Sequence, residues 1–540
     1  MDFDYIIIGA GSAGCVLAAR LSADPARRVL VLEAGPRDWH PFIHMPAGLA
    51  RLARNRRINW DYSTEPQPQL GNRVIWWPRG KVLGGSSSIN AMCYIRGTPA
   101  DYDGWTERTG DSRWAWNNVL PYFKRAERNS RGADAWHGGD GPLDVSDLRH
   151  VNPLTHAFVE AGTQMGLARN DDFNGSTQVG VGLYQVTQRD GVRCSAAVAY
   201  LDPVKARRNL RVVTGALTTR ITFDRTSRGR PRANGVECTI RGRSVHFGAR
   251  EVIVCGGTIN SPQLLMLSGI GDTDALRRLG IDATQHLPGV GTNLQDHLDV
   301  CTLQHETQRT SYDRASEVKT AFDYYLRGHR GPGTSNIAEG GAFLRSRLAT
   351  DDRADIQLHF IPAMIDDHGR RRLPGDGYTL HACFLRPRSR GRITLASNRA
   401  ADKPRIEANY LGDEEGFDLK MLIECAKVSL DLLARPAFDR YRGAPIHPAR
   451  VPASDAEWSE FVRTRAETVY HPVGTCRMGR DDGAVVDPEL RVHGVDGLRV
   501  VDASVMPVLP SGNTNAPTIM LAELASDLIL GRPARSDQPA

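Results

Sequence analysis

Two short apolar runs, separated by a helical pattern, begin the chain. Residues 4–8 have the pattern of a strand that is buried on both faces of a parallel sheet. Residues 15–21 follow a helical pattern, and a second apolar run at residues 28–32 ends at Glu33. Strand, helix and strand in this order predict a βαβ unit, and therefore an α/β fold with a parallel sheet.

Three glycines, Gly9, Gly11 and Gly14, connect the first strand to the helix. In a dinucleotide fold they allow a tight turn, a close approach of the backbone to a pyrophosphate and tight packing of helix on strand. The N-terminus of the helix offers free N–H groups to the phosphates. Glu33 follows about 20 residues later, where a carboxylate accepts hydrogen bonds from ribose hydroxyls and repels a 2′-phosphate. These features predict a site for FAD or NAD rather than NADP; the alternative is a tight turn that binds nothing.

A third apolar strand pattern, at residues 251–255, ends at a pair of glycines. After it, Ser261 is expected as a helix N-cap and Pro262 as the first helical residue. This second strand-and-helix unit should lie in the same sheet as the first. Residues 209–213 and 219–223 have β patterns and are expected to cover the nucleotide.

Between about residues 301 and 461, glycine-rich turns become rare and segments of alternating polarity appear. Residues 355–360 and 378–384 are typical of antiparallel strands with one covered face. The predicted fold is therefore α/β (α+β overall), with a Rossmann-like domain on a parallel sheet and a substrate domain on an antiparallel sheet with helices. The expected boundaries give residues 1–155, 200–299 and 465–540 to the first domain, and residues 156–199 and 300–464 to the second.

Length and composition narrow the class of protein. A chain of 540 residues is too long for one ordinary core, so two or more large domains are expected. The formal net charge of +6 is spread along the chain without a basic block, which argues against nucleic acid as a partner. Nine cysteines at irregular spacing, with no CxxC pair, argue against a disulfide framework or a zinc site.

The position of the first strand and the length of the apolar runs indicate where in the cell the protein is expected. The first strand begins within five residues of Met1, which leaves no room for a secretory signal before it. No run of about 18 residues lacks glycine, proline and charge, so no membrane span is expected. We expect a cytoplasmic protein, with peripheral membrane association left open.

A run of small and polar residues at positions 79–91 interrupts a loop-rich segment. Gly84, Gly85, Ser86 and Asn90, with the serines between them, supply N–H and hydroxyl donors at the entry to a helix. Such a concave run of donors suits a phosphate or a flat ring with polar edges, and the alternative is a plain helix entry.

This run, extended over residues 80–103, resembles the first signature of the glucose–methanol–choline (GMC) oxidoreductases, which are FAD-dependent enzymes that act on alcohols. Three further segments are similar to motifs of that family and stand in the same order, at residues 257–271, 293–297 and 471–479. The resemblance extends from residue 4 to about residue 530. Its expected catalytic pair, a histidine and an asparagine rather than two histidines, is more similar to that of members that oxidise choline and aliphatic alcohols than to that of glucose oxidases.

The resemblance implies that FAD is the cofactor and that both ends of the chain contact it. A backbone group near Thr218 would meet the adenine, and Asp502 with Ala503 would contact the pyrophosphate or ribityl chain, unless they only form a strand-end turn. Some relatives tether FAD through a histidine at the position of Ile89, so the isoleucine implies noncovalent FAD. The expected cofactor-binding residues are Gly9, Gly11, Ser12, Ala13, Gly14, Glu33, Ala34, Arg79, Gly84, Gly85, Ser86, Asn90, Ala91, Met92, Thr218, Asp502, Ala503, Asn513 and Thr514.

Oxidation of an alcohol removes a hydroxyl proton and a carbon-bound hydride; a flavin takes the hydride, and the protein supplies a base. His471 is the expected base, since Pro472 keeps it out of helical geometry within the matching motif; a structural or exposed histidine is the alternative. In the family a histidine or asparagine faces this base across the flavin. Counted from Asp502, that position falls on Asn513, with Asn515 as a rival that also fits a helix cap.

Three residues are candidates for the substrate pocket. His359 aligns loosely with a pocket histidine of choline-oxidising relatives, or is a satisfied strand histidine. Glu339 is either a substrate-facing carboxylate or a polar residue on a sheet face. Tyr470 precedes His471 in the sequence and is expected to line the pocket.

These features predict oxidation of primary alcohols, or of aldehyde hydrates, with oxygen or a quinone-type carrier as electron acceptor. Choline is an alternative substrate, although no aromatic or acidic cage for its quaternary ammonium can be located in the sequence. An enzyme of the hydroxynitrile lyase type, in which FAD is structural, is an alternative of another class. An NAD enzyme or nucleotide-binding scaffold is a third. No metal is expected, and the oligomeric state is left open.

Overall fold

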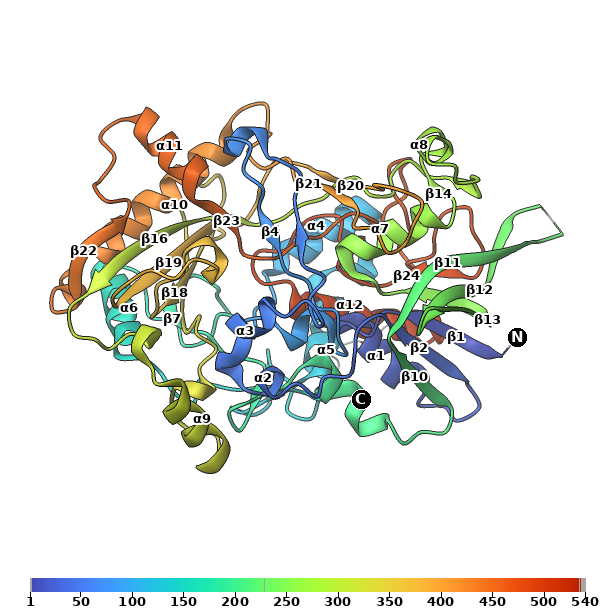
Figure 1. The fold of residues 1–540 in the computed structure, drawn as a ribbon, viewed down its shortest axis with the longest axis horizontal. Helices are drawn as coiled ribbons and strands as arrows, with labels where there is room; N and C mark the ends of the chain where they lie inside the picture. Colours follow the sequence, from blue (N-terminus) through green and yellow to red (C-terminus); the bar gives the residue numbers. More distant parts are fainter. Residues whose placement is uncertain (1, 228, 534, 536–540) are drawn as a thin grey trace.

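The computed structural model describes residues 2–227, 229–533 and 535. Within them, two seven-stranded sheets form the framework and lie toward opposite ends of the molecule in Figure 1. The first sheet has the order β10–β2–β1–β13–β12–β11, and β24 also pairs with β13. Its strands are β1 (Phe3–Ile8), β2 (Val29–Glu33), β10 (Leu210–Thr214), β11 (Ala216–Arg225), β12 (Pro231–Ile240), β13 (Arg243–Val254) and β24 (Leu498–Val500).

The centre of this sheet is the predicted βαβ unit. Ile7 of β1 lies opposite Val31 of β2 and Ile253 of β13, in parallel register on both sides. All three side chains are fully buried, and α1 (Ser12–Leu21) packs on β1 and β2. The parallel sheet, and the place of the third strand in it, are therefore confirmed.

β13 changes partners along its length. Its first half, up to Gly248, pairs antiparallel with β12, and from Ala249 onward it pairs parallel with β1. Residues 209–213, expected as a cover, instead extend the parallel sheet as β10, while residues 219–223 lie in β11 of the antiparallel part. The segments that were expected to cover the nucleotide are thus strands of the first sheet.

The helix after β13 begins earlier than predicted. α7 runs from Gly257 to Leu267, so Pro262 lies inside the helix and Ser261 is not its N-cap. A proline in this position cannot donate to the carbonyl four residues earlier, which belongs to Thr258. The hydroxyl of Thr475 donates to that carbonyl at 2.6 Å, so a residue distant in the sequence satisfies it.

The second sheet is antiparallel throughout and has the order β22–β16–β19–β18–β17–β7, with β23 also paired to β16. The predicted strands at residues 355–360 and 378–384 are found in it as β18 and β19. Its strands are β7 (Gly180–Leu183), β16 (Leu298–Glu306), β17 (Gly340–Leu344), β18 (Ile356–Ile361), β19 (Gly377–Phe384), β22 (Arg442–His447) and β23 (Ala466–Thr468).

The expectation of one covered face on this sheet was wrong, because nearly all residues of β18 and β19 are buried. One cause is α10 (Phe417–Leu433), which packs on β16 and β19. Among the polar residues that alternate with the apolar ones, His381 lines the cavity described below, and Gln357 and His359 contact Asn513 of its lining. Their polarity predicted that they are exposed to solvent, whereas they face the interior of the protein.

The two ends of the chain meet at α1, which packs against α12 (Asn515–Ile529). Arg20 of α1 forms a 2.7 Å ion pair with the buried Glu523 of α12. The other helices are α2 (Pro41–His44), α3 (Leu49–Ala53), α4 (Pro99–Thr109), α5 (Trp116–Ala126), α6 (Pro153–Gln164), α8 (Thr273–Arg278), α9 (Glu317–Leu326) and α11 (Asp455–Arg465). Among the described residues, none of the helices is both long enough and apolar enough to cross a bilayer.

The domain boundaries stay a prediction. The two sheets correspond to the two expected units, but β23, just beyond residue 465, pairs with β16 of the second sheet. The segment from residue 469 to residue 518 then contributes to the cavity beside both sheets. This arrangement brings the C-terminal motifs to the N-terminal glycine turn.

Candidate active site

A cavity of about 400 Å³ is lined by residues of both sheets. One end is formed by the N-terminal glycine turn, the ends of β1 and β2, and part of β11; the other end includes residues 469–472 and His381 of β19. Its size is within the range of pockets that hold cofactors and small substrates.

Two glycine-rich turns meet at the first end. A Cβ atom on Gly14 would lie 1.9 Å from the carbonyl oxygen of Gly9, and one on Gly85 would lie 2.7 Å from Cα of Gly11. Only glycine allows these approaches. A Cβ on Gly11, by contrast, would meet nothing nearer than 4.0 Å, so the backbone at Gly11 is open to the cavity. An unobstructed backbone at the N-terminus of α1 suits a diphosphate.

Glu33 and Thr218 lie at the same end. Both oxygens of Glu33 already accept one backbone N–H, from Ala10 at 2.9 Å and from Gly35 at 2.8 Å, and each keeps a further lone pair. Burial raises the pKa of Glu33 to about 7 although both hydrogen bonds lower it. Oγ1 of Thr218 lines the cavity, buried and without a hydrogen-bond partner. A nucleoside would supply the missing partners, so this end fits the adenosine half of FAD.

The carboxylate of Asp502 is hydrogen-bonded to groups of the protein. Its carboxylate accepts hydrogen bonds from the N–H of Gly257 (2.8 Å), the hydroxyl of Ser261 (2.5 Å) and the N–H of Ser504 (2.8 Å). Burial raises its pKa, and the hydrogen bond from Ser261 is the largest of the opposing effects. Asp502 therefore ties α7 to the end of β24, and a contact between this segment and FAD is expected through the backbone.

Most of the expected cofactor-binding residues line the cavity, which is how a single ligand could contact both ends of the chain. Gly14 and Gly84 do not, because Gly14 packs on the backbone of Gly9 and Gly84 donates its N–H to Ala10. The lining residues among them are Gly9, Gly11, Ser12, Ala13, Glu33, Ala34, Arg79, Gly85, Ser86, Asn90, Ala91, Met92, Thr218, Asp502, Ala503, Asn513 and Thr514.

His471 lies at the second end, in a chain of three hydrogen bonds. Nε2 of His297 is 3.0 Å from the carbonyl oxygen of Leu385, which can only accept, so this nitrogen carries the proton. Nδ1 of neutral His297 is then an acceptor, and Nδ1–H of His471 donates to it at 3.0 Å. Nε2 of His471 is left unprotonated, 3.0 Å from the amide nitrogen Nδ2 of Asn513. The lone pair of a neutral base is thus directed to Asn513.

The electrostatics keep His471 neutral. Its pKa is well below the usual 6.5, mainly because of burial and then because of His297, His359 and Arg79. Burial likewise lowers the pKa of His297 to about 4. An imidazole with a low pKa is unprotonated at neutral pH and can accept a proton there.

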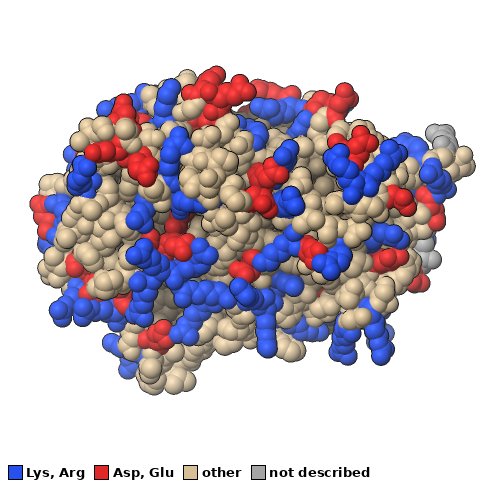
Figure 2. Space-filling view, turned by 45° about the horizontal axis from the view of Figure 1, so that its top comes forward, with Lys and Arg blue, Asp and Glu red and all other residues tan. Residues whose placement is uncertain are grey.

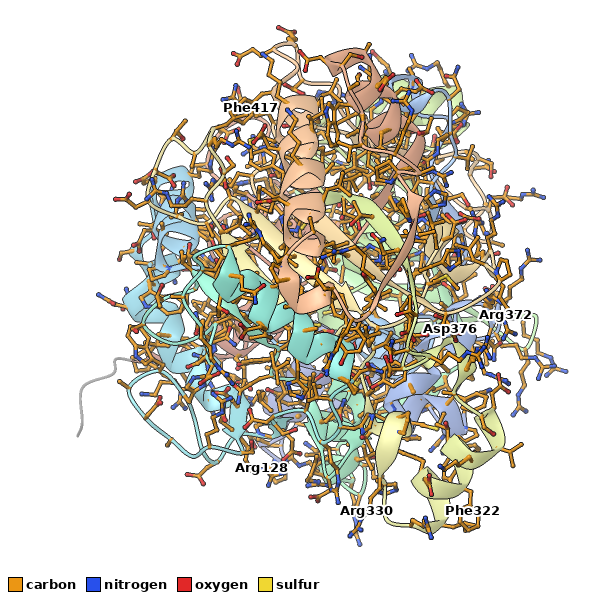
Figure 3. The ribbon with its side chains drawn as sticks, turned by 90° about the vertical axis from the view of Figure 1, so that its left-hand side faces the viewer. Arg128, Phe322, Arg330, Arg372, Asp376 and Phe417 are labelled. Atoms are coloured by element: carbon orange, nitrogen blue, oxygen red, sulfur yellow. The ribbon has the colours of Figure 1, made fainter. Side chains whose placement is uncertain are left out.

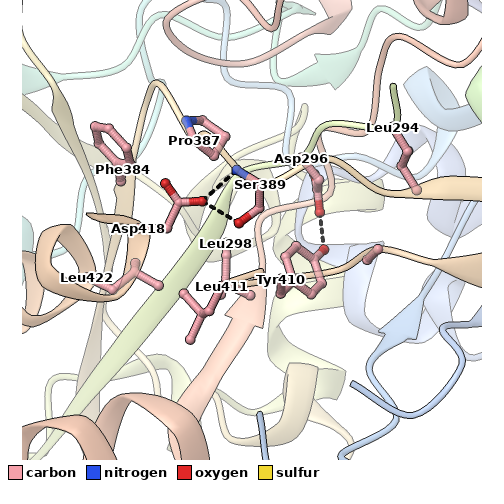
Figure 4. Close-up of a pocket in the computed structure, with 11 residues that line it drawn as sticks. Leu294, Asp296, Leu298, Phe384, Pro387, Ser389, Tyr410, Leu411, Asp418 and Leu422 are labelled. Atoms are coloured by element: carbon pink, nitrogen blue, oxygen red, sulfur yellow. Dashed lines mark hydrogen bonds between the residues drawn. The ribbon is translucent and has the colours of Figure 1, made fainter. Parts of the chain in front are cut away.

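The backbone of His471 is fixed by Asp296, which also lines a small second cavity shown in Figure 4. One oxygen of Asp296 accepts the N–H of His471 at 2.8 Å, and the other accepts the hydroxyls of Thr468 and Tyr410. Burial raises the pKa of Asp296 to about 6. This carboxylate thus fixes the backbone of the segment that carries His471 and does not line the main cavity.

The two candidate asparagines lie at different ends of the cavity. Asn513 is beside His471, and its Oδ1 accepts from the amide of Gln357 at 3.0 Å, which directs Nδ2 toward the imidazole. Asn515 instead accepts from the hydroxyl of Ser12 at 2.7 Å, in the dinucleotide turn. Asn513 is therefore the one in position to act with His471, and its role stays a prediction.

The three substrate-pocket candidates differ. Tyr470 lines the cavity, with its hydroxyl 2.6 Å from Nδ1 of His368. His359 is buried against Tyr184 with Nδ1 unpartnered, and burial, the largest of several effects, lowers its pKa to about 3. Glu339 does not line the cavity, so the sheet-face alternative describes it.

The carboxylate of Glu339 is saturated by hydrogen bonds inside the second unit. It accepts from the hydroxyls of Thr155 and Ser335, each at 2.6 Å, and from the N–H of Asn152 at 2.9 Å. These partners come from α6 and from the loops beside β17. A carboxylate with so many donors stabilises the fold and is not available to a substrate.

Sequence reasoning assigned no role to three residues that the structure places at the site. His297 was quoted within the motif at residues 293–297, but the sequence does not show that it contacts His471, 174 positions away. His368 and His381 line the cavity, and Nδ1 of His368 lies 2.6 Å from the hydroxyl of Tyr470. For His381, the available indication was the presence of a polar, titratable residue inside the predicted strand at residues 378–384.

Comparisons with known proteins agree with the geometry. Sequence models of the GMC oxidoreductases match residues 3–299 and 387–522. An alcohol dehydrogenase [acceptor] from Pseudomonas putida is 47% identical, covering 98% of this chain and 96% of its own. The mitochondrial choline dehydrogenase of Mus musculus is 45% identical, covering 99% and 91%. The crystal structure of pyridoxine 4-oxidase from Mesorbium loti superposes with a TM-score of 0.89 at 33% identity, covering 98% and 100%.

Proposed function

The chain belongs to the GMC oxidoreductases, and from this premise we propose that it oxidises primary alcohols to aldehydes, with His471 as the proton acceptor. FAD-dependent oxidation at a CH–OH group is common to this family, so membership of the family confirms the expected reaction class. The observation that carries the proposal is the unprotonated Nε2 of His471, 3.0 Å from Nδ2 of Asn513 in the lining of the main cavity.

The residues that would hold FAD lie at the end of the cavity that fits its adenosine half. The N–H groups at the start of α1, near Gly11, suit the diphosphate, and Glu33 suits the ribose. When bound, FAD supplies the acceptor for the hydride that leaves the alcohol carbon.

The protein's own groups then account for the proton. The alcohol hydroxyl would take the place of the direct contact between His471 and Asn513, donating to Nε2 and accepting from Nδ2–H. Nε2 of His471 takes the proton, and the Nδ1–H of the resulting cation remains bonded to His297. The amide of Asn513 binds the negative charge that develops on the alcohol oxygen and does not compete for its proton.

An uncharged alcohol fits this cavity better than choline. The acidic residues among its described lining are Glu33 and Asp502, both at the nucleotide end. Asp299, in the second sheet, is buried and hydrogen-bonded to His381. Among the described lining residues, a quaternary ammonium therefore finds no carboxylate at the end that holds Asn513; Oδ1 of Asp299 has no hydrogen-bond partner, but Asp299 does not line the cavity.

Choline stays as a second candidate, because Trp76 and Tyr470 provide aromatic side chains in the lining and several similar proteins are choline dehydrogenases. However, the guanidinium of Arg370 already lies 5.3 Å from the ring centroid of Trp76. A panel of primary aliphatic alcohols, choline and aldehydes, compared by kcat/KM, tests the proposal. A higher kcat/KM for choline than for every uncharged alcohol would reverse the assignment.

The electron acceptor is either oxygen or a quinone-type carrier. Reducing the enzyme with alcohol in the absence of oxygen and then admitting air separates the two. Rapid return of the flavin colour indicates an oxidase, whereas slow return in air and fast return with a soluble quinone indicates a dehydrogenase.

His297 is proposed to position the base. In His297→Leu the Nδ1–H of His471 loses its acceptor, so the imidazole can present the wrong tautomer, and we expect kcat to fall ~10–100-fold with little change in KM. His297→Gln should restore most of kcat, since Gln can donate to Leu385 and accept from His471. The exposed His156→Leu is the matched control. Equal losses in His297→Leu and His297→Gln would contradict a positioning role.

FAD is expected to be held without a covalent bond, because Ile89 lines the cavity where tethered relatives have a histidine. Acid precipitation of the purified yellow protein should leave the flavin in the supernatant. The measurement is the flavin absorbance of supernatant and washed pellet. A yellow pellet would show that another residue forms a bond to the cofactor.

A further inference from the structure

Helix α9 turns its apolar side chains away from the protein. Val318, Phe322 and Leu326 are 82%, 50% and 72% exposed, and Tyr325 is exposed as well. Spaced three and four residues apart, these side chains form one stripe along the helix. Tyr324, on another face, is buried. The usual arrangement of a surface helix, with its apolar stripe against the core, is thus reversed.

This helix is nevertheless attached to the fold. The hydroxyl of Tyr324 donates to the carbonyl oxygen of His44 at 2.8 Å, and that of Tyr325 to the carbonyl oxygen of Pro41 at 3.2 Å. Arg51 of α3 forms an ion pair with Glu317. In Figure 3, α9 with Phe322 projects from the lower edge of the molecule, close to Arg330. The apolar stripe is therefore held outward on a convex projection.

Exposed cations surround the stripe. Its two acidic neighbours are already paired, Glu317 with Arg51 and Asp323 with Arg327. The exposed basic residues of α9, of the turn after it and of the adjacent segments are Arg37, Arg51, Arg54, Lys319, Arg327 and Arg330. In Figure 2, α9 forms the mostly tan projection at the lower left, and lysines and arginines gather in a band above it.

Trp39 adds a second apolar group on the segment that α9 contacts. It is 77% exposed, and the guanidinium of Arg37 lies 5.4 Å from its ring centroid. Two residues later, Pro41 accepts the hydrogen bond from Tyr325. Aromatic and aliphatic side chains on one surface, bordered by Lys and Arg, are the composition of segments that lie in a membrane interface.

We propose that α9, with Trp39 and the surrounding basic residues, is a docking surface for a bilayer that contains anionic lipid. A convex apolar projection can enter the acyl region between headgroups, whereas a protein partner would need a matching hollow. Four of the surrounding cations form no ion pair among the described residues and are complementary to anionic headgroups: Arg37, Arg54, Lys319 and Arg330. This surface is next to α3, whose Leu49 and Ala53 line the main cavity, so docking would place that side of the cavity toward the membrane.

Co-sedimentation of the FAD-loaded enzyme with vesicles tests the proposal. We expect binding to vesicles of equal parts phosphatidylglycerol and phosphatidylcholine, weaker binding to phosphatidylcholine alone, and a decline with added salt. Phe322→Ser/Leu326→Ser should weaken binding ~10–100-fold because it removes the apolar contact. Lys319→Glu/Arg330→Glu should weaken it ~10-fold or more, and only for the anionic vesicles.

Val451→Ser, at a 67% exposed position elsewhere on the surface, is the matched control and should bind as the native protein does. All variants should retain flavin and oxidise a water-soluble alcohol at the native rate, so failure of docking is distinct from failure of the proposed function. Absence of binding to anionic vesicles would overturn the proposal. A dimer that Phe322→Ser/Leu326→Ser dissociates would also overturn it and assign the surface to a second copy of the chain.

Discussion

Replacement of His471 by alanine should slow the reduction of bound FAD by a primary alcohol ~10²–10⁴-fold, the usual contribution of a positioned general base. The variant loses the unprotonated Nε2 that lies 3.0 Å from Nδ2 of Asn513. FAD binding should be retained, because the contacts proposed for the nucleotide lie at the other end of the cavity. Anaerobic rapid mixing, followed by the flavin absorbance, measures this rate directly.

His368→Ala is the matched control. His368 also lines the cavity, and burial also lowers its pKa, to about 4, but its Nδ1 bonds to Tyr470 rather than to Asn513. This variant should lose less than ~10-fold in flavin reduction. Reduction of His471→Ala at a near-native rate would remove His471 from the role of base.

Replacement of Asn513 by leucine, which has a similar volume and no hydrogen-bond donor, should lower the same rate ~10²–10³-fold. One donor to a developing oxyanion is typically worth ~2.7–4 kcal/mol. In the structure, Gln357 fixes the amide so that Nδ2 faces His471. Stopped-flow reduction at saturating alcohol separates this effect from weaker binding of the substrate.

Asn515→Leu provides the comparison for that prediction. Asn515 bonds to Ser12 in the dinucleotide turn, so its loss should weaken the retention of FAD and leave the reduction rate of the bound flavin nearly unchanged. If Asn515→Leu slowed flavin reduction more than Asn513→Leu, the two assignments would have to be exchanged.

The nucleotide end of the protein was largely predictable because its determinants are local. Strand, glycine turn, helix and Glu33 occupy the first part of the chain. Gly14 is required by its contact with Gly9 inside that motif, whereas Gly11 has no such contact and leaves its backbone open. The start of α7 was not predictable from local rules. Pro262 fits a first helical turn. The hydroxyl that lets it lie further inside the helix belongs to Thr475, which donates to the carbonyl of Thr258, 217 positions away from it.

The catalytic end shows the same division between local and distant causes. The motif around His471 indicated a base, but the tautomer depends on His297 and on a carbonyl of Leu385, which packing alone brings together. The alternating polarity of β18 and β19 predicted that one face of the sheet is exposed to solvent. This prediction failed because the polar side chains face the interior of the protein, which the sequence does not show. Glu339 was undecided for a similar reason, since its donors come from other segments.

Anaerobic mixing of the purified enzyme with primary alcohols is the most direct measurement of the proposed reaction. It should bleach the flavin, with formation of an equivalent amount of aldehyde, and an alcohol with deuterium on the reacting carbon should react more slowly. A flavin that no alcohol reduces, in a protein that cleaves cyanohydrins, would instead indicate a lyase with structural FAD and contradict oxidation at this site.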